Sequence, residues 1–209
     1  DTPDVGEWRF DGHNMSRVVA HKTASMGMVR TFQLTKSLTK MTVIENMKLG
    51  AIHQVGEKWW KGLLPFLWKS QEAKIEDRAD ALLKRFKMDH MHNEYAGTLS
   101  GGQRKLLEMA RALMTEPKLV MLDEPMAGVN PALKQSLNEH IRGLRDDGMT
   151  VLFVEHDMDM VNDVADWVVV MAEGILIAEG TPEQIGSNPQ VIEAYLGSNQ
   201  GKSLLDRQV

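Results

Sequence analysis

The sequence predicts an α/β protein with a parallel-stranded core, a helical region in its middle and one antiparallel hairpin. Two short apolar runs, residues 118–122 (K-L-V-M-L) and 150–154 (T-V-L-F-V), are typical of strands covered on both faces. An amphipathic segment separates them, and a strand–helix–strand unit of this length joins parallel strands. Two further apolar runs, 167–171 and 175–178, flank Glu173-Gly174 and predict the hairpin.

Composition narrows the class of protein. The 209 residues suit one globular domain, or a domain with a subdomain, and carry a formal net charge of -5. A nucleic-acid binder usually presents a basic face, so this balance disfavours that class. The absence of cysteine excludes disulfides and cysteine-based metal sites, which suits a cytosolic protein. No apolar run approaches the roughly 20 residues that span a bilayer.

The first elements follow from local signals. Polar and apolar side chains alternate over residues 7–11, and Gly6 and Gly12 flank this segment. The pattern predicts a half-buried strand. Ser16 is expected to cap a short helix that Gly27 ends, and residues 28–33 (M-V-R-T-F-Q) to form a strand. Thr42 and Glu45 have the spacing of a capping box, which opens a helix towards Ile52.

The middle of the chain changes composition. An aromatic-rich stretch, residues 56–69, contains Trp59, Trp60 and Trp68. The residues after it place apolar side chains at helical spacing, namely Ile75, Ala79, Leu82, Leu83 and Phe86. We therefore expect a helical region here; the aromatic side chains either dock a partner or simply bury in the core.

The segment T-L-S-G-G-Q-R-K-L-L-E-M-A-R-A-L-M, residues 98–114, combines a good N-cap, Ser100, with Gly101 and Gly102. Glycines let a ligand approach the backbone, and the free amides of a helix start attract anions. The buried stripe would consist of Leu106, Leu107, Ala110, Leu113 and Met114. A well-capped core helix accounts for the same pattern.

Polar residues follow the apolar strands. Asp123 and Glu124 end the strand L-V-M-L, at the edge where open α/β sheets bind ligands. Asp123 suits Mg²⁺, and Glu124 suits the orientation or deprotonation of water. His156 follows the next strand, so it would project from the same edge and could donate to a phosphoryl oxygen. Gln33, at the end of an earlier strand, has an amide that can contact water or a metal. The alternatives are solvated strand-end acids for Asp123 and Glu124, a structural histidine for His156 and an ordinary surface glutamine for Gln33.

The remaining helices have clear starts. Asn130-Pro131 begins a helix with a stripe at Leu133, Leu137, Ile141 and Leu144, and Gly148 follows its end. Thr181 to Gln184 and Asn188-Pro189 begin two more. Residues 197–203 (G-S-N-Q-G-K-S) imitate the phosphate loop G-x-x-x-x-G-K-[ST]. They have one residue too few between the glycines and follow no strand, so we reject them as such a loop.

Taken in order, these motifs resemble an ABC-transporter ATPase: Gln33, then L-S-G-G-Q at 99–103, L-V-M-L-D-E-P at 119–125, and His156. The resemblance covers essentially the whole chain. It implies a P-loop NTPase-like (RecA-like) parallel core, an inserted α-helical subdomain and an antiparallel β element. The implied boundaries are 1–33 and 115–209 for the core with the β element, and 34–114 for the helical subdomain with the signature, within one partial ATPase domain.

The resemblance also implies roles by position. Gln33 would be the Q-loop glutamine, a possible metal ligand that links the nucleotide site to membrane subunits. Ser100, Gly101, Gly102 and Gln103 would form the signature that meets ATP held by a second subunit. Asp123 would help to hold Mg²⁺, Glu124 would be the catalytic glutamate, and His156 the switch histidine. Residues 127–130 (A-G-V-N) would be the D-loop, with Asn130 in place of the commoner Asp.

The family's subgroup and partners are also implied. A-G-V-N-P, M-V-R-T-F-Q and the ending P-E-Q-I…V-I-E-A-Y-L-G resemble ATPases of branched-chain amino-acid importers. Urea importers and the lipopolysaccharide-export ATPase share several of these features and remain alternatives. Such proteins act as dimers, homodimeric or heterodimeric, on transmembrane permease subunits, peripherally on the inner face of the cell membrane, with ATP and Mg²⁺ as cofactors.

In such proteins a strand, the phosphate loop and its helix precede the segment that matches Pro3 to Gly6. None of these is found here, and the chain begins at Asp1, so we expect an N-terminally truncated ATPase that does not hydrolyse ATP alone. Two other readings stay open: a soluble ABC protein working on DNA or ribosomes, and a non-catalytic chain that only binds a partner.

Overall fold

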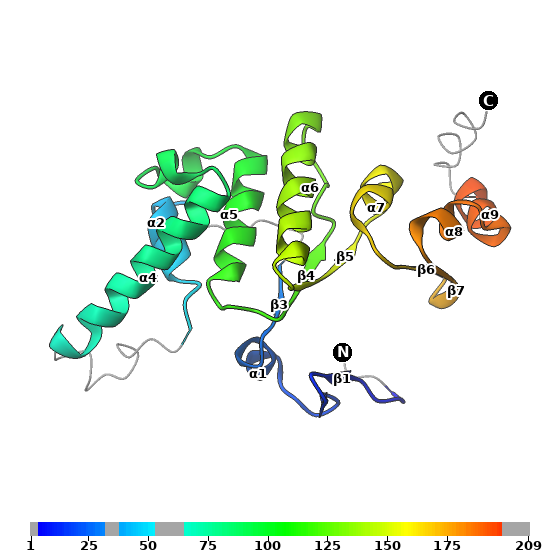
Figure 1. Cartoon of the computed structure of the whole chain (residues 1–209), viewed down its shortest axis with the longest axis horizontal. Coiled ribbons are helices and arrows are strands. Elements are labelled where there is room, and N and C mark those ends of the chain that lie inside the picture. Colours follow the sequence, from blue (N-terminus) through cyan, green and yellow to red (C-terminus); the bar gives the residue numbers. More distant parts are fainter. Residues whose placement is uncertain (1–3, 32–37, 53–64, 198–209) are drawn as a thin grey trace. The chain divides into compact units, whose positions relative to one another are not determined.

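The computed structural model describes residues 4–31, 38–52 and 65–197, and its contacts divide the chain into two compact units, Asp1–Val154 and Glu155–Val209 (Figure 1). Gln33, Trp59, Trp60 and the G-K-S tail lie outside the described residues, as does the side chain of Trp68.

The first unit is built on a parallel sheet of three described strands. These are β3 (Met28–Arg30), β4 (Leu119–Asp123) and β5 (Thr150–Val154), in the order β3-β4-β5. Val29 pairs with Val120, and Val120 pairs with Val151. The predicted parallel α/β unit is confirmed. Val120 and Leu122 of the central strand are buried, as a parallel strand requires.

The prediction that residues 150–154 are covered on both faces is wrong. In β5 the side chains of Leu152 and Val154 are 53% and 63% exposed, whereas Val151 and Phe153 are half-buried. The strand pairs only with β4 among the described strands, and α6 (Pro131–Asp146) packs against it. Its alternating pattern is that of an edge strand with one open face.

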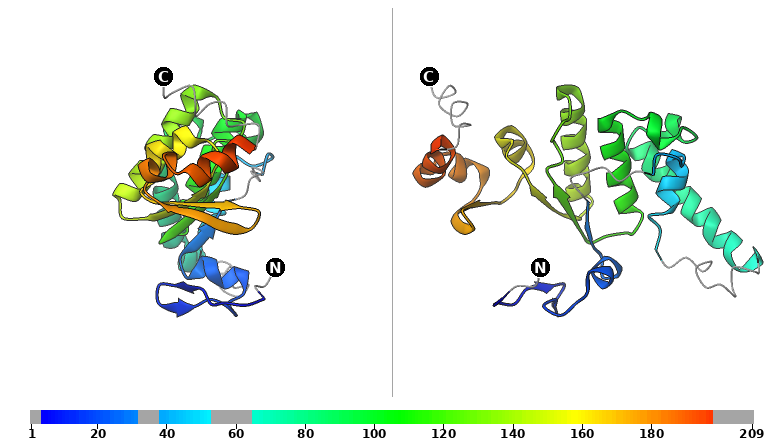
Figure 2. Two further views of the ribbon diagram at one scale, coloured as in Figure 1. Left: turned by 90° about the vertical axis from the view of Figure 1, so that its right-hand side faces the viewer. Right: turned by 180° about the vertical axis from the view of Figure 1, so that it is seen from behind.

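Helices α5 (Gly101–Leu113) and α6 lie side by side in this unit, with α4 (Pro65–Arg85) beyond α5 (Figures 1 and 2). Ser100 and Asn130 cap α5 and α6 through side-chain oxygens, as predicted. The apolar stripe predicted for α5 is buried, and so are the residues of α6 and α4 that share its core: Leu106, Leu107, Ala110, Leu113, Met114, Leu137, Ile141, Leu144, Ala79, Leu83 and Phe86.

The described residues of the middle region, 38–52 and 65–98, contain the predicted helices. This region contains α2 (Val43–Lys48), α4 and two 3₁₀ turns, η2 (Asp89–Met91) and η3 (Ala96–Thr98). Thr42 and Glu45 form the predicted capping box, in which the Thr42 N–H donates to Glu45 Oε2 at 2.7 Å. These bonds from Thr42 hold the pKa of Glu45 below its usual value. Asn46, fully buried, donates to the Leu38 carbonyl and accepts from its N–H, which fixes residues 38–42 on α2.

The N-terminal segment differs from its prediction in two details. The strand predicted over residues 7–11 is shorter, and it forms a small hairpin of β1 (Arg9–Phe10) and β2 (His13–Asn14). Ser16 does not cap α1 (Ala20–Ser25), because a turn closed by the Val18 N–H and the Met15 carbonyl precedes the helix. Val19 is the N-cap and makes no side-chain cap. Gly27 follows the helix at φ +95°, as its role at a helix end requires.

The second unit contains α7 (Met158–Val164), the predicted hairpin of β6 (Val168–Ala172) and β7 (Ile175–Gly180), and helices α8 (Pro182–Gly186) and α9 (Pro189–Gly197). The hairpin turns at Glu173 and Gly174, both with positive φ. Its core consists of Ala178, Ile185 and Val191, where α8 and α9 pack on β7 (Figure 2). None of the helices within the described residues has the length and apolarity needed to cross a bilayer.

Candidate functional site

Asp123 ends β4, and its carboxylate lies beside a cation from the neighbouring strand. Arg30, the last residue of β3, donates from Nη2 to Asp123 Oδ2 at 2.8 Å. The Asp123 side chain is 28% exposed, so the carboxylate reaches solvent at the carboxyl end of the parallel sheet. The place of Asp123 was predicted from the sequence, but that of Arg30 was not. The only available signal was its position at the end of the strand pattern M-V-R.

Glu124 follows directly and has an unusual backbone. Its φ of 44° lies in the left-handed region, which costs a non-glycine residue of the order of 1–3 kcal/mol. Its N–H donates to the Val154 carbonyl at 3.0 Å, and its own carbonyl accepts from the Ala127 N–H at 3.1 Å. This bend turns successive side chains in different directions, so Asp123 and Glu124 can act on different groups.

The start of α5 is held by a reciprocal cap. The Gln103 N–H donates to Ser100 Oγ at 3.3 Å, and the Ser100 N–H donates to Gln103 Oε1 at 2.8 Å. The Gln103 carboxamide oxygen thus organises the helix start itself. Ser100 is exposed, and its hydroxyl proton can still be donated to a ligand oxygen.

The two signature glycines have different surroundings. A Cβ on Gly101 would meet no atom within 4 Å, whereas a Cβ on Gly102 would lie 1.8 Å from Leu133 Cδ2 of α6. Gly101 therefore leaves open space beside the helix start. Gly102 is needed for the close approach of α5 to α6, in addition to any contact with a ligand.

Asn130 acts on the protein itself. Its Oδ1 accepts from the Leu133 N–H at 2.9 Å, which caps α6, and Pro131 occupies the first helical position. The loop from Glu124 to Asn130 is also contacted by Lys105 of α5, a residue that sequence analysis did not single out. Thr31, Lys105, Glu108 and Asp123 line one small hollow in this unit.

His156 begins the second unit, just after β5. Its side chain is 57% exposed, and its ring Nδ1 lies 3.9 Å from Glu155 Oε2. Its backbone N–H donates to the same carboxylate oxygen at 3.2 Å. The first unit therefore contains the signature, Asp123, Glu124 and Asn130; His156 belongs to the second unit, and Gln33 lies outside the described residues.

The donor set at Asp123 fits Mg²⁺. Mg²⁺ bound with a nucleotide usually takes one or two carboxylates, phosphate oxygens and water. Asp123 offers one solvent-reaching carboxylate; its Oδ2 accepts from Arg30, so Mg²⁺ would share this carboxylate with the guanidinium. Within the described residues there is no cluster of three or more acidic or histidine side chains that would hold a metal by themselves.

Two known protein families match parts of this sequence. The ABC transporter family matches residues 1–127, which include the capped α5 and both acidic residues of the β4 end. A second family, the branched-chain amino acid ATP-binding cassette transporter, matches residues 176–199. The chain belongs to the ABC transporter family.

Among relatives, the chain is 42% identical over 198 residues to the high-affinity branched-chain amino acid transport ATP-binding protein LivG of Escherichia coli (strain K12). It is 41% identical over 199 residues to the probable LivG of Archaeoglobus fulgidus, and 40% identical over 198 residues to BraF of Pseudomonas aeruginosa. The matches cover 93%, 95% and 93% of this chain, respectively, and 77% of each relative.

Solved structures give the same fold. A nucleotide-free ATP-binding cassette from an ABC transporter matches with a TM-score of 0.76 at 35% identity, over 92% of this chain and 77% of the other. The ADP conformation of an ATP-binding cassette matches equally well at 34% identity. The α/β fold of an ABC ATPase, of the P-loop NTPase type, is thus confirmed. This family binds nucleotide and hydrolyses ATP, typically with Mg²⁺.

Proposed function

We propose that this chain belongs to the ATP-hydrolysing subunit that energises an ABC importer of branched-chain amino acids. The observation that carries the proposal is that one unit contains both a capped helix start at Ser100 and a strand end at Asp123-Glu124. Relatives at 40–42% identity carry branched-chain amino-acid transport names, which supports this substrate over urea or lipopolysaccharide.

In this proposal Asp123 would hold Mg²⁺, which would supply positive charge against the phosphate oxygens of bound ATP. Glu124 orients the attacking water and accepts its proton. Ser100 and the free amides at the start of α5 contact the phosphates of a nucleotide held by a second copy. His156 would donate to the transferred phosphoryl group, and Gln33 would be a metal ligand. Asn130 acts through the cap of α6.

The assembly follows from these roles. Because the signature serves a nucleotide on another subunit, two copies meet head to tail around a two-fold axis and share two composite sites. We propose that residues 34–114 form the helical subdomain and that residues 1–33 and 115–209 form the core. The helical region around Gln33 to Phe86 docks on the permease subunits, on the cytoplasmic side of the membrane.

A chimera tests the function. Residues of Escherichia coli LivG that match this chain are replaced by the 209 residues, so that LivG supplies the remainder. The chimera is expected to hydrolyse ATP and to restore leucine uptake in a strain without LivG. Glu124→Gln should lower the ATPase rate at least about 100-fold, because the water loses its base. Hydrolysis without leucine uptake would contradict the substrate assignment alone; no hydrolysis would contradict the function.

A second measurement concerns the 209 residues by themselves. The sequence contains no G-x-x-x-x-G-K-[ST] segment, so nothing in it cradles the β- and γ-phosphates. We expect the purified chain to show no ATP hydrolysis above background. Magnesium-dependent turnover that Glu124→Gln abolishes would overturn this expectation.

A further inference from the structure

Lys105 of α5 directs its ammonium group at the backbone of another element. Its Nζ donates to the carbonyl oxygens of Glu124 at 3.2 Å, Pro125 at 3.1 Å and Ala127 at 2.5 Å. An ammonium group has three N–H donors, and here it has three main-chain acceptors. Hydrogen bonds from a charged donor are about twice as strong as neutral ones. A half-buried lysine with this many backbone acceptors is a specific structural contact.

The three carbonyls belong to the loop that joins β4 to α6. This loop starts at Glu124, whose left-handed backbone is held by hydrogen bonds to the Val154 carbonyl and from the Ala127 N–H. A strained residue persists only where several contacts determine its conformation together. Lys105 supplies one of these contacts directly, through the Glu124 carbonyl, and fixes the rest of the turn through Pro125 and Ala127.

The same two helices also touch near their starts. Gly102, in the first turn of α5, packs so closely on Leu133 of α6 that a Cβ would lie 1.8 Å from Leu133 Cδ2. Leu133 is also the residue whose N–H Asn130 caps. The start of α5, the loop 124–130 and the start of α6 are therefore connected at two points, one polar and one apolar.

We propose that Lys105 is a positioning residue: it fastens the loop that carries Glu124 to the helix that carries the signature. A displacement of α5 then moves the backbone of Glu124 with it. The structural part of this inference stands on the contacts alone. Its catalytic part rests on the proposed function, in which the start of α5 meets a nucleotide on a second copy.

Hydrogen exchange in the 209-residue chain tests the structural part. Lys105→Met keeps the length of the side chain but removes the charge and all three donors; Lys105→Arg keeps a cation. We expect the Ala127 and Val129 amides to exchange at least about fivefold faster in Lys105→Met, because their turn loses three charged hydrogen bonds. The Gln103 amide should not change. Lys84→Met, at an exposed lysine of α4, is the matched control.

Equal exchange at Ala127 and Val129 in wild type and Lys105→Met would overturn the inference. Should Lys105→Met fail to fold, nitrogen-15 spectroscopy of the wild-type ammonium decides. The Lys105 Nζ hydrogens should exchange with water more slowly than those of Lys84, and equal rates would refute the contact.

The chimera with LivG tests the catalytic part. Lys105→Met should lower kcat about tenfold with an unchanged KM for ATP, since Glu124 is misplaced while nucleotide binding is retained. Lys105→Arg should recover most of kcat. A loss of thermal stability with unchanged kcat would reject the positioning role. A chimera that is inactive before any substitution would instead contradict the proposed function, and hydrogen exchange would still test Lys105.

Discussion

At the scale of single residues, the two signature glycines illustrate how one motif combines two requirements. Gly101 faces open space, which leaves room for close approach of a ligand. Gly102 faces Leu133, whose side chain would have to shift to admit a Cβ. The adjacent Gln103 likewise uses its side chain to cap α5. A residue pattern that identifies a family thus contains positions kept for structural reasons.

We therefore predict that the two glycines respond differently to alanine. Gly101→Ala should leave the free energy of unfolding unchanged or slightly higher, because alanine favours helix over glycine and meets no atom. Gly102→Ala should lower it by about 1–3 kcal/mol, because Leu133 must leave its rotamer. Urea unfolding of the 209-residue chain measures both.

The activity of the chimera separates the roles further. Gly101→Ala should reduce ATP hydrolysis although the protein remains stable, since a methyl group now occupies the space beside the helix start. If Gly102→Ala proved as stable as wild type, Leu133 would have yielded freely and the packing argument would fail.

At the scale of elements, local signals predicted the helix starts and distant contacts explain the misses. The caps at Thr42, Ser100 and Thr181 were predicted because a capping box joins residues only three apart. The exposure of β5 was not predicted, because the burial of a strand depends on which other strands and helices pack against it. Lys105 and Arg30 were missed for the same reason: their partners lie 19 or more residues away, and helical or strand periodicity carries no information about them.

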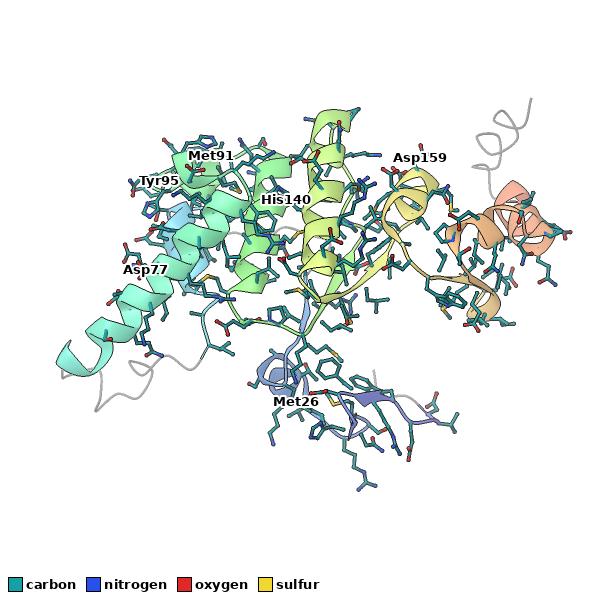
Figure 3. All side chains as sticks on the ribbon, in the orientation of Figure 1. Met26, Asp77, Met91, Tyr95, His140 and Asp159 are labelled. Carbon is teal, nitrogen blue, oxygen red and sulfur yellow. The ribbon has the colours of Figure 1, made fainter. Side chains whose placement is uncertain are left out.

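Helix α6 carries a pH-sensitive contact to the end of α4. The His140 ring, labelled in Figure 3, stacks on Phe86 with centroids 4.5 Å apart. Burial holds the pKa of His140 below its usual value, the cations Lys87 and Arg85 lower it further, and Glu139 opposes them. Arg85 also pairs with Asp147 at 2.6 Å.

This lowered pKa predicts that His140 destabilises the fold in acid. Above the unfolded pKa of about 6.5 the imidazole is neutral in both states and contributes no pH dependence. As the pH falls below that value, the unfolded chain binds a proton that the folded chain does not, so stability is lost. We expect the loss of urea midpoint between pH 7.5 and pH 5.5 to be smaller in His140→Gln than in wild type.

The other six histidines contribute equally to both proteins, so the difference between the two pH dependences isolates His140. Identical pH dependences would mean that His140 is protonated as easily in the folded protein as in the unfolded chain.

At the scale of the whole molecule, the last strand of the parallel sheet in the first unit, β5, has an exposed apolar face. Leu152 and Val154 of β5 are more than half exposed, and among the described strands β5 pairs only with β4. Parallel strands are normally covered on both faces, and an exposed apolar face is a site for association with another chain. The 209-residue chain should therefore self-associate through this strand as its concentration rises.

The prediction can be tested by changing only the open face. Leu152→Thr combined with Val154→Thr places β-branched, strand-favouring side chains at both positions but reduces the apolar surface, so the variant should stay monomeric at several-fold higher concentration, with a urea midpoint close to wild type. Phe153→Thr is the matched control, because Phe153 is half-buried on the opposite face of the strand. Loss of its ring should lower the free energy of unfolding by about 3 kcal/mol and leave the open face intact. Light scattering against concentration, with unfolding measured in parallel, distinguishes the two. If the double variant associated at the same concentration as wild type, β5 would not be the surface responsible, and the exposed apolar residues of the β6–β7 hairpin, Val169, Met171 and Ile175, would be the next to replace.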